Sequence, residues 1–184
     1  MKVTKILGVD PGTTVLGYSI IEIDRDQIKL LCLDIIKLDK KSDHQTRLKE
    51  IFLQLQEVIE TYLPEVMAIE APFFGKNVQS MLKLGRAQGV AMAAAMTMGL
   101  EITEYSPKKI KKAVTGNGNA AKEQVAAMLT HLVHKDVQHA SLDATDALAT
   151  AYCHYLKMSG AQTSSVKRYG NWASFMKDNP GRVK

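Results

Sequence analysis

The sequence predicts an α/β domain built on a mixed β-sheet, in which three antiparallel strands come first and helices then alternate with strands. The first 37 residues contain three apolar runs rich in β-branched residues and separated by short polar breaks, a pattern typical of strands joined by tight turns. From residue 43 onward, segments with apolar residues at helical spacing alternate with short apolar runs. This alternation favours parallel pairing in the second half of the chain.

The strands of the predicted meander cover residues 3–9, 15–23 and 28–37, with turn signals at Asp10-Pro11-Gly12 and in the polar break 24–27. Apolar positions recur at i, i+3, i+4 and i+7 through residues 43–62, which predicts an amphipathic helix that ends before Pro64. Residues 66–70 are then expected to form a short buried strand of the parallel type, because they follow a crossover helix.

A second long helix is predicted over residues 78–98, where glycines and alanines recur at four-residue spacing. These small residues would let another backbone approach closely, either in the core or across a dimer interface. Residues 101–105 form a further predicted strand, and Ser106-Pro107 is typical of the cap and first position of a helix. That helix is short and rich in lysine. A loop at 116–119 and two helices, over 120–133 and 142–155, complete the prediction.

Composition places the chain among globular proteins of one ordinary domain, because 46% of its 184 residues are hydrophobic and 23% are charged. No secretory signal or membrane span is expected, since the most apolar helical stretch, 89–100, is shorter than the roughly 20 residues a span needs. We therefore expect a cytoplasmic protein. Cys32 and Cys153 lie in apolar runs without a second cysteine at ligand spacing, which predicts buried free thiols.

Positive charge is concentrated in two segments. The chain as a whole has a net charge of +5, and residues 157–184 alone contribute six basic residues and one aspartate. Residues 104–123 add five lysines against two glutamates. Such concentration fits a phosphate-binding face, although a lysine cluster is as often a solvated helix face. We expect a domain over residues 1–158 and a basic tail or small appended element over 159–184.

Four carboxylates stand where a sheet-based site would place them. Asp10 closes the first strand and Glu70 ends the fourth, directly before Ala71-Pro72. A charged residue at the end of a buried strand is costly unless it is paired or bound to a cation. Asp143 and Asp146 lie three residues apart near the start of a helix, so both project from one face. Several acids that converge repel one another, and hard divalent cations with oxygen ligands relieve that repulsion.

Each acid also has a purely structural interpretation. Asp10 could serve only as a turn residue before proline and glycine. Asp143 could serve only as a helix N-cap, with Asp146 supporting the helix dipole. Glu70 is the hardest to explain in this way, because its strand is otherwise apolar.

Taken together, the motifs resemble the RuvC family of Holliday-junction resolvases within the ribonuclease H-like superfamily. The matching segments are residues 6–12 with Gly17-Tyr18, Ile69-Glu70, Asn77 with residues 82–90, and residues 143–149. They occur in family order and cover about residues 3–157. The resemblance implies a ribonuclease H-like fold and a homodimer that resolves four-way DNA junctions by paired symmetric nicks. It also implies a branch-migration helicase partner.

The resemblance assigns roles to particular residues of this sequence. It implies Asp10, Glu70, Asp143 and Asp146 as the catalytic acids, which bind Mg²⁺, most simply two ions, with Mn²⁺ able to substitute. Phe73, or its neighbour Phe74, fits the aromatic that inserts near the junction crossover. Lys111 and Lys122 fit two lysines that contact DNA, although Lys111 lies within a run of four lysines at 108, 109, 111 and 112. Further DNA contacts are expected from Lys76, Lys83 and Lys108.

Two other classes of protein are compatible with parts of the sequence. Actin-like ATPases and sugar kinases share an acidic strand-and-turn motif near the N-terminus, but they generally need a second domain and a second phosphate loop. A junction-binding protein without catalysis is the other alternative. The presence of all four acids argues against it.

Overall fold

The computed structural model describes residues 3–25, 27–72, 77–137 and 139–160, and it confirms the predicted mixed α/β fold. Five strands form one sheet in the order β3-β2-β1-β4-β5. The strands β1, β2 and β3 pair antiparallel, whereas β4 and β5 continue the sheet parallel to β1. The strands are β1 (Thr4–Asp10), β2 (Val15–Asp24), β3 (Gln27–Lys37), β4 (Val66–Glu70) and β5 (Glu101–Tyr105).

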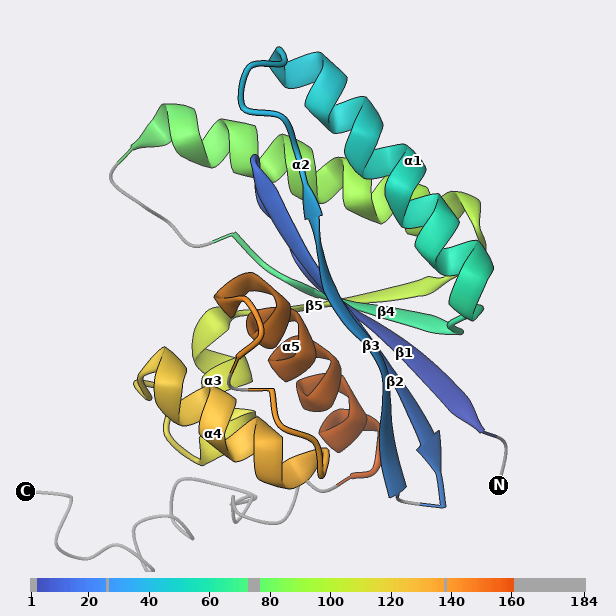
Figure 1. Ribbon diagram of the computed structural model, residues 1–184, viewed down its shortest axis with the longest axis vertical. Coiled ribbons are helices and arrows are strands. Elements are labelled where there is room, and N and C mark those ends of the chain that lie inside the picture. The colour runs from blue at the N-terminus through green and yellow to red at the C-terminus, as the bar shows by residue number, and fades with distance from the viewer. Residues whose placement is uncertain (1–2, 26, 73–76, 138, 161–184) are drawn as a thin grey trace, which may run out of the picture.

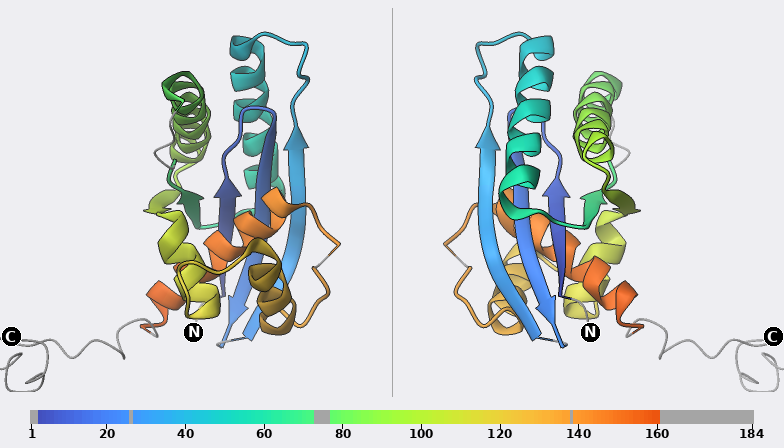
Figure 2. Two further views of the ribbon diagram at one scale, coloured as in Figure 1. Left: turned by 90° about the vertical axis from the view of Figure 1, so that its left-hand side faces the viewer. Right: turned by 90° about the vertical axis from the view of Figure 1, so that its right-hand side faces the viewer.

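Helices cover both faces of the sheet (Figures 1 and 2). The helices are α1 (His44–Tyr62), α2 (Val78–Thr97), α3 (Pro107–Thr115), α4 (Lys122–Leu132) and α5 (Leu142–Met158). Helices α1 and α2 lie together against one face, and α3, α4 and α5 lie against the other. Side chains alternate between the two faces along each strand. In β1, Ile6 packs toward α5, whereas Leu7 and Val9 pack toward α1 and α2.

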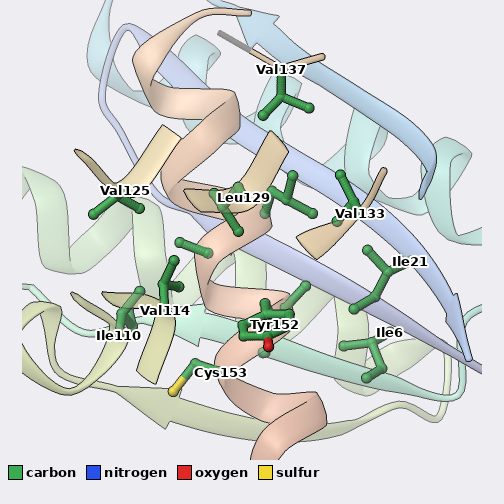
Figure 3. Packing of buried hydrophobic residues seen from close by; sticks show 14 of the residues in the cluster. Ile6, Ile21, Ile110, Val114, Val125, Leu129, Val133, Val137, Tyr152 and Cys153 are labelled. Carbon is green, nitrogen blue, oxygen red and sulfur yellow. The ribbon is translucent and has the colours of Figure 1, made fainter. Parts of the chain in front are cut away.

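The core on the α5 face is built from side chains of the sheet and of three helices. Figure 3 shows Ile6 and Ile21 of the sheet near Leu129 of α4 and Tyr152 of α5. All four residues are buried. Burying a large apolar side chain stabilises a fold by about 1.5–3 kcal/mol. This core therefore fixes the position of α5 on the sheet.

Helix α5 crosses β1 and β2 where both strands carry glycine. A Cβ atom at Gly17 would stand 1.9 Å from the carbonyl oxygen of Asp143, and one at Gly8 would stand 2.2 Å from that of Ala147. No side chain fits at those distances, so only glycine allows the helix backbone to rest on the sheet. The first turns of α5 consequently lie directly against the strands.

The element boundaries agree with the sequence predictions to within a few residues. Helix α1 ends at Tyr62. Leu63, with a left-handed backbone (φ 52°), caps the helix before Pro64. Helix α3 begins as predicted, with Ser106 as N-cap and Pro107 at its first position. Helix α4 starts at Lys122 rather than at residue 120, and α5 extends to Met158. Of the predicted tail over 159–184, only Ser159 and Gly160 lie within the described residues.

The cysteine prediction is correct for one residue and wrong for the burial of the other. Neither cysteine forms a disulfide, and Cys153 is fully buried in the core on the α5 face. Cys32 is only half-buried, because β3 is an edge strand and α1 covers it incompletely. Among the described residues, no helix is both long enough and apolar enough to cross a membrane.

Candidate functional site

Asp10 and Glu70 are brought together by parallel pairing of their strands. In the register of β1 and β4, Val9 lies opposite Ile69, so the next residues, Asp10 and Glu70, end neighbouring strands at the same edge of the sheet. Strand alternation then decides the face. Ile6 and Ala68, each at an even spacing from these acids, belong to the core on the α5 face. Both carboxylates are therefore directed toward α5.

Helix α5 supplies the other two acids at the same place. Gly17 pairs with Asp10 in the antiparallel register, and the carbonyl of Asp143 lies against Gly17. Asp143 and Asp146, three residues apart, share one side of the helix. The N-cap is Ser141, whose side chain accepts a hydrogen bond from the Ala144 amide, so the interpretation of Asp143 as an N-cap is wrong. Its carboxylate is consequently not used as the cap.

The charges of these acids act on one another strongly. Burial, followed by the charges of Glu70, Asp146 and Asp143, raises the pKa of Asp10 to about 8. Burial and the charge of Asp146 raise the pKa of Glu70 to about 7. A buried carboxylate beside like charges favours its neutral form, because burial removes the water that would stabilise the charge and the neighbouring acids repel it. Pairs of acids perturbed in this way are characteristic of functional sites.

Two lysines partly compensate the negative charge. The ammonium of Lys122, at the start of α4, forms an ion pair with the carboxylate of Asp146. Burial acts to lower the pKa of Lys122, but the hydrogen bond to Asp146 and the charges of Asp146, Asp10 and Asp143 outweigh it and raise the pKa. The charge of Lys111 in α3 acts on Glu70 together with that of Lys122. Both lysines predicted from the sequence therefore stand beside the acids.

The acids and lysines border an open pocket of about 510 Å³ between α3, α4 and α5. Glu70 and Asp146 line it on the acidic side, and Lys108, Lys111 and Lys122 line it on the basic side. Ser106 and Asn119 contribute polar groups that were not predicted from the sequence. Residues 106–107 had been assigned only a capping role, and residues 116–119 only a loop. An anion can enter this pocket along its lysines and reach the acids.

The donor set suits a hard divalent cation. All four groups are carboxylates, and burial together with neighbouring negative charge raises the pKa values of Asp10 and Glu70, a cost that a bound cation would offset. Within the described ranges, no three His, Cys, Asp or Glu side chains are yet grouped tightly enough to hold a metal ion. Asp146 is instead paired with Lys122. Small side-chain rotations that release Asp146 from Lys122 are therefore needed for the acids to share one ion.

The other residues that were predicted to contact DNA lie in different parts of the fold or outside the described residues. Lys108 lies in the pocket, whereas Lys83 is exposed on α2, on the other face of the sheet. Phe73, Phe74 and Lys76 lie outside the described residues. The small residues of α2 were expected to allow a close approach either in the core or across a dimer interface. Its buried alanines pack in the core with α1, whereas a Cβ atom at Gly85 or Gly89 would meet no described residue within 4 Å apart from its own stretch of helix.

The mixed sheet with an acidic centre under its covering helix defines a nuclease domain of the ribonuclease H-like class. The sequence model of the family described as crossover junction endodeoxyribonuclease RuvC matches residues 6–154. The chain therefore belongs to the RuvC family of crossover junction endodeoxyribonucleases.

Relatives and solved structures agree with this assignment. The crossover junction endodeoxyribonucleases RuvC of Bacteroides fragilis and Cytophaga hutchinsonii are 52% and 54% identical to this chain over 97% of its length, and they are covered to 95% and 88% of their own lengths. The structure of Thermus thermophilus RuvC in complex with Holliday junction substrate superposes with a TM-score of 0.78. It is 30% identical, with 85% of this chain and 96% of that chain covered.

Proposed function

We propose that this protein resolves four-way DNA junctions by paired symmetric nicks and that Asp10, Glu70, Asp143 and Asp146 form its metal-binding catalytic centre. The observation that carries the proposal is the convergence of these acids from two strand ends and one helix start. It is supported by the raised pKa values of Asp10 and Glu70, which follow first from burial and then from the charges of neighbouring acids. A relative of the same family has been solved with a Holliday junction substrate.

Mg²⁺ is the proposed cofactor, with two ions as the simplest count for four carboxylates and Mn²⁺ as a substitute. Divalent ions held by these acids supply Lewis-acid activation of water and stabilisation of the leaving oxygen. The residues of the chain bind the ions and the substrate. Deprotonated Asp10 and Glu70 would hold the ions, while Lys111 and Lys122 attract the phosphodiester into the pocket. Once bound cations neutralise the acids, Lys122 can separate from Asp146 and approach the phosphate.

We further propose a homodimer, because two symmetric nicks require two centres related by a two-fold axis. The exposed apolar side chains of α2, Leu82 and Met96, together with the open backbone at Gly85 and Gly89, support an interface on this helix. A cytoplasmic location and a branch-migration helicase partner complete the proposal. Both follow from a role in DNA recombination and repair.

A nicking assay tests the proposed activity against its alternatives. The purified chain is incubated with a four-way junction and with a linear duplex of the same arms, in Mg²⁺, Mn²⁺ or EDTA. Paired nicks on the junction alone, dependent on metal, are expected. Binding without nicking would instead favour a non-catalytic junction-binding protein. ATP hydrolysis without nicking, in a parallel assay, would favour the actin-like and sugar-kinase class.

Replacing Lys111 or Lys122 with alanine is expected to weaken junction binding and to lower its salt dependence. Each lysine that neutralises a phosphate contributes about 1 to the slope of log K against log salt concentration. Lys112→Ala is the matched control, because Lys112 is an exposed neighbour on α3 that does not line the pocket. Unchanged slopes for both Lys111→Ala and Lys122→Ala would remove these lysines from the phosphate contacts.

Replacing Phe73 with alanine is expected to leave junction binding intact but to slow cleavage severely. An aromatic side chain that stacks on an unpaired base contributes about 1–3 kcal/mol, which would hold the crossover at the acids. The measurement is single-turnover nicking at saturating protein, with Phe74→Ala run in parallel to decide which aromatic acts. Normal cleavage by both variants would contradict a role for either residue.

A further inference from the structure

A basic cluster lies on the face of the sheet opposite the acidic pocket, between the first turn of α1 and the second and third turns of α2. It consists of His44, Arg47, Lys83 and Arg86, and the charges of the three cations act on the His44 imidazole. His44 and Arg47 are three residues apart on α1, as are Lys83 and Arg86 on α2, so each pair shares one side of its helix. The two helices lie side by side (Figure 1).

Two members of this basic cluster have hydrogen-bonding groups without a partner. Both ring nitrogens of His44 and the Nε of Arg47 are shielded from solvent and make no hydrogen bond within the described part of the chain. Buried polar groups are almost always paired, and leaving one unpaired destabilises the fold. The Arg47 Nε–H is a fixed donor, and the imidazole donates from one or both nitrogens. An anion that displaces the side chains covering these nitrogens would meet hydrogen-bond donors and positive charge in the basic cluster.

The position of Arg47 connects the basic cluster to the acidic centre. Its Nη1 donates a hydrogen bond of 2.9 Å to the carbonyl oxygen of Thr13, in the loop that follows Asp10. Three residues span at most about 11 Å, so the Cα of Thr13 lies within that distance of the Cα of Asp10. One DNA strand advances about 3.4 Å per nucleotide. A strand that runs from the acids toward this loop would reach it within a few nucleotides.

Asp43, whose charge acts on His44, is largely committed elsewhere. The Asp43 carboxylate caps α1 by accepting hydrogen bonds from the backbone N–H of Thr46 at 2.8 Å and from its hydroxyl at 3.0 Å. Burial first, and then the charges of Arg47, Arg86 and Lys83, lower the pKa of His44 in spite of the opposing charge of Asp43. The surroundings of the imidazole are therefore net positive.

We propose that His44, Arg47, Lys83 and Arg86 form a second phosphate site, which holds a backbone phosphate of the DNA strand a few nucleotides from the cleaved bond. This inference rests on the proposed function, in which the chain binds DNA at all. Arg47 and His44 donate hydrogen bonds to the phosphate oxygens, and Lys83 and Arg86 supply charge from the other helix. The site reads no sequence and positions the strand over the acidic centre.

Junction binding measured against salt concentration tests the site. The background is Asp10→Asn, so that the DNA stays intact. Arg86→Ala, at an exposed position, is expected to lower the salt slope by about 1 and to weaken binding several-fold, and His44→Ala is expected to weaken it as well. Lys49→Ala is the matched control, because this exposed lysine on α1 points about 200° away from Arg47 around the helix axis. Slopes and affinities unchanged in both test variants would overturn the proposal.

The imidazole of His44 gives a second measurement, made on the chain with the site unaltered. Its pKa, followed by NMR and assigned by the signal missing in His44→Ala, is expected below the ordinary value in the free protein and higher with junction DNA bound. A pKa that does not rise on binding would overturn the second phosphate site even if every variant loses affinity. If the unaltered chain neither binds nor nicks the junction, the proposed function fails. If it does both while Arg86→Ala equals Lys49→Ala, the second phosphate site alone fails.

Discussion

Replacing Asp10 with asparagine is expected to abolish junction nicking and, in metal-free buffer, to make the folded protein more stable. The loss of activity follows from removing a central oxygen ligand of the proposed cations. The gain in stability follows from burial and from the charges of Glu70, Asp146 and Asp143, which raise the pKa of Asp10 from 3.8 to about 8. Asparagine has nearly the same shape without the charge.

The sign and pH range of this stability effect are fixed by the direction of the pKa shift. A carboxyl group whose pKa is higher in the folded state binds more protons there than in the unfolded chain between pH 3.8 and about 8. Stability therefore falls as the pH rises through this range, and the penalty is complete above it. We expect Asp10→Asn to recover on the order of a few kcal/mol at pH 8 and much less at pH 4.

Thermal unfolding and nicking of the same preparations check this prediction. Asp24→Asn removes one carboxylate from an exposed strand end and is the control, with an expected change of about 0.5 kcal/mol or less. Added Mg²⁺ should stabilise the unaltered chain more than Asp10→Asn, because ligands stabilise only the state that binds them. A variant that nicks normally, or that is less stable than the unaltered chain at pH 8, would contradict the assignment of Asp10.

Replacing Gly17 with alanine is expected to destabilise the fold by several kcal/mol and to displace Asp143 from the acidic centre. The added Cβ would stand 1.9 Å from the carbonyl oxygen of Asp143 and 2.9 Å from the amide nitrogen of Ala144, both backbone atoms that cannot move alone. Overpacking by a single methyl group typically costs about 1–3 kcal/mol, and a clash with backbone costs more. Helix α5 must then lift from the sheet.

Urea unfolding and single-turnover nicking measure the two consequences of Gly17→Ala separately. The control is Ser19→Ala, which alters a buried side chain two residues along the same strand. The Ser19 hydroxyl has no hydrogen-bond partner in the described part of the chain, so its removal is expected to leave stability unchanged or raised. A Gly17→Ala chain with unchanged stability and unchanged nicking would show that α5 does not rest on β2 in this way.

Much of the acidic centre could be predicted from the sequence because strand ends are visible there. Glu70 ends a strand whose other residues are apolar, and such a position needs a compensating partner. Asp10 precedes a turn signal, and parallel pairing after a crossover helix places neighbouring strand ends at one edge of the sheet. The resemblance of the ordered motifs to the RuvC family then grouped Asp10 and Glu70 with Asp143 and Asp146. Local pattern and topology are sufficient for these residues.

Other features could not be predicted, because they depend on contacts between distant parts of the chain. The need for glycine at positions 8 and 17 arises only once α5 lies against β1 and β2. The pairing of Lys122 with Asp146, and the distinction between Lys111 and its neighbours, depend on how α3 and α4 pack beside α5. Asp143 was open to interpretation as an N-cap until Ser141 was seen to fill that position.

The central claim, that the four acids form one metal centre, is tested most directly by calorimetric titration with Mn²⁺ in buffers of different ionisation enthalpy. Because the pKa values of Asp10 and Glu70 are raised to about 8 and about 7, binding at pH 7 should release protons, and the release should vanish at high pH. Glu70→Gln should weaken binding strongly and reduce the proton release. Mn²⁺ binding that releases no protons at pH 7 and is unaffected by Glu70→Gln would contradict the claim.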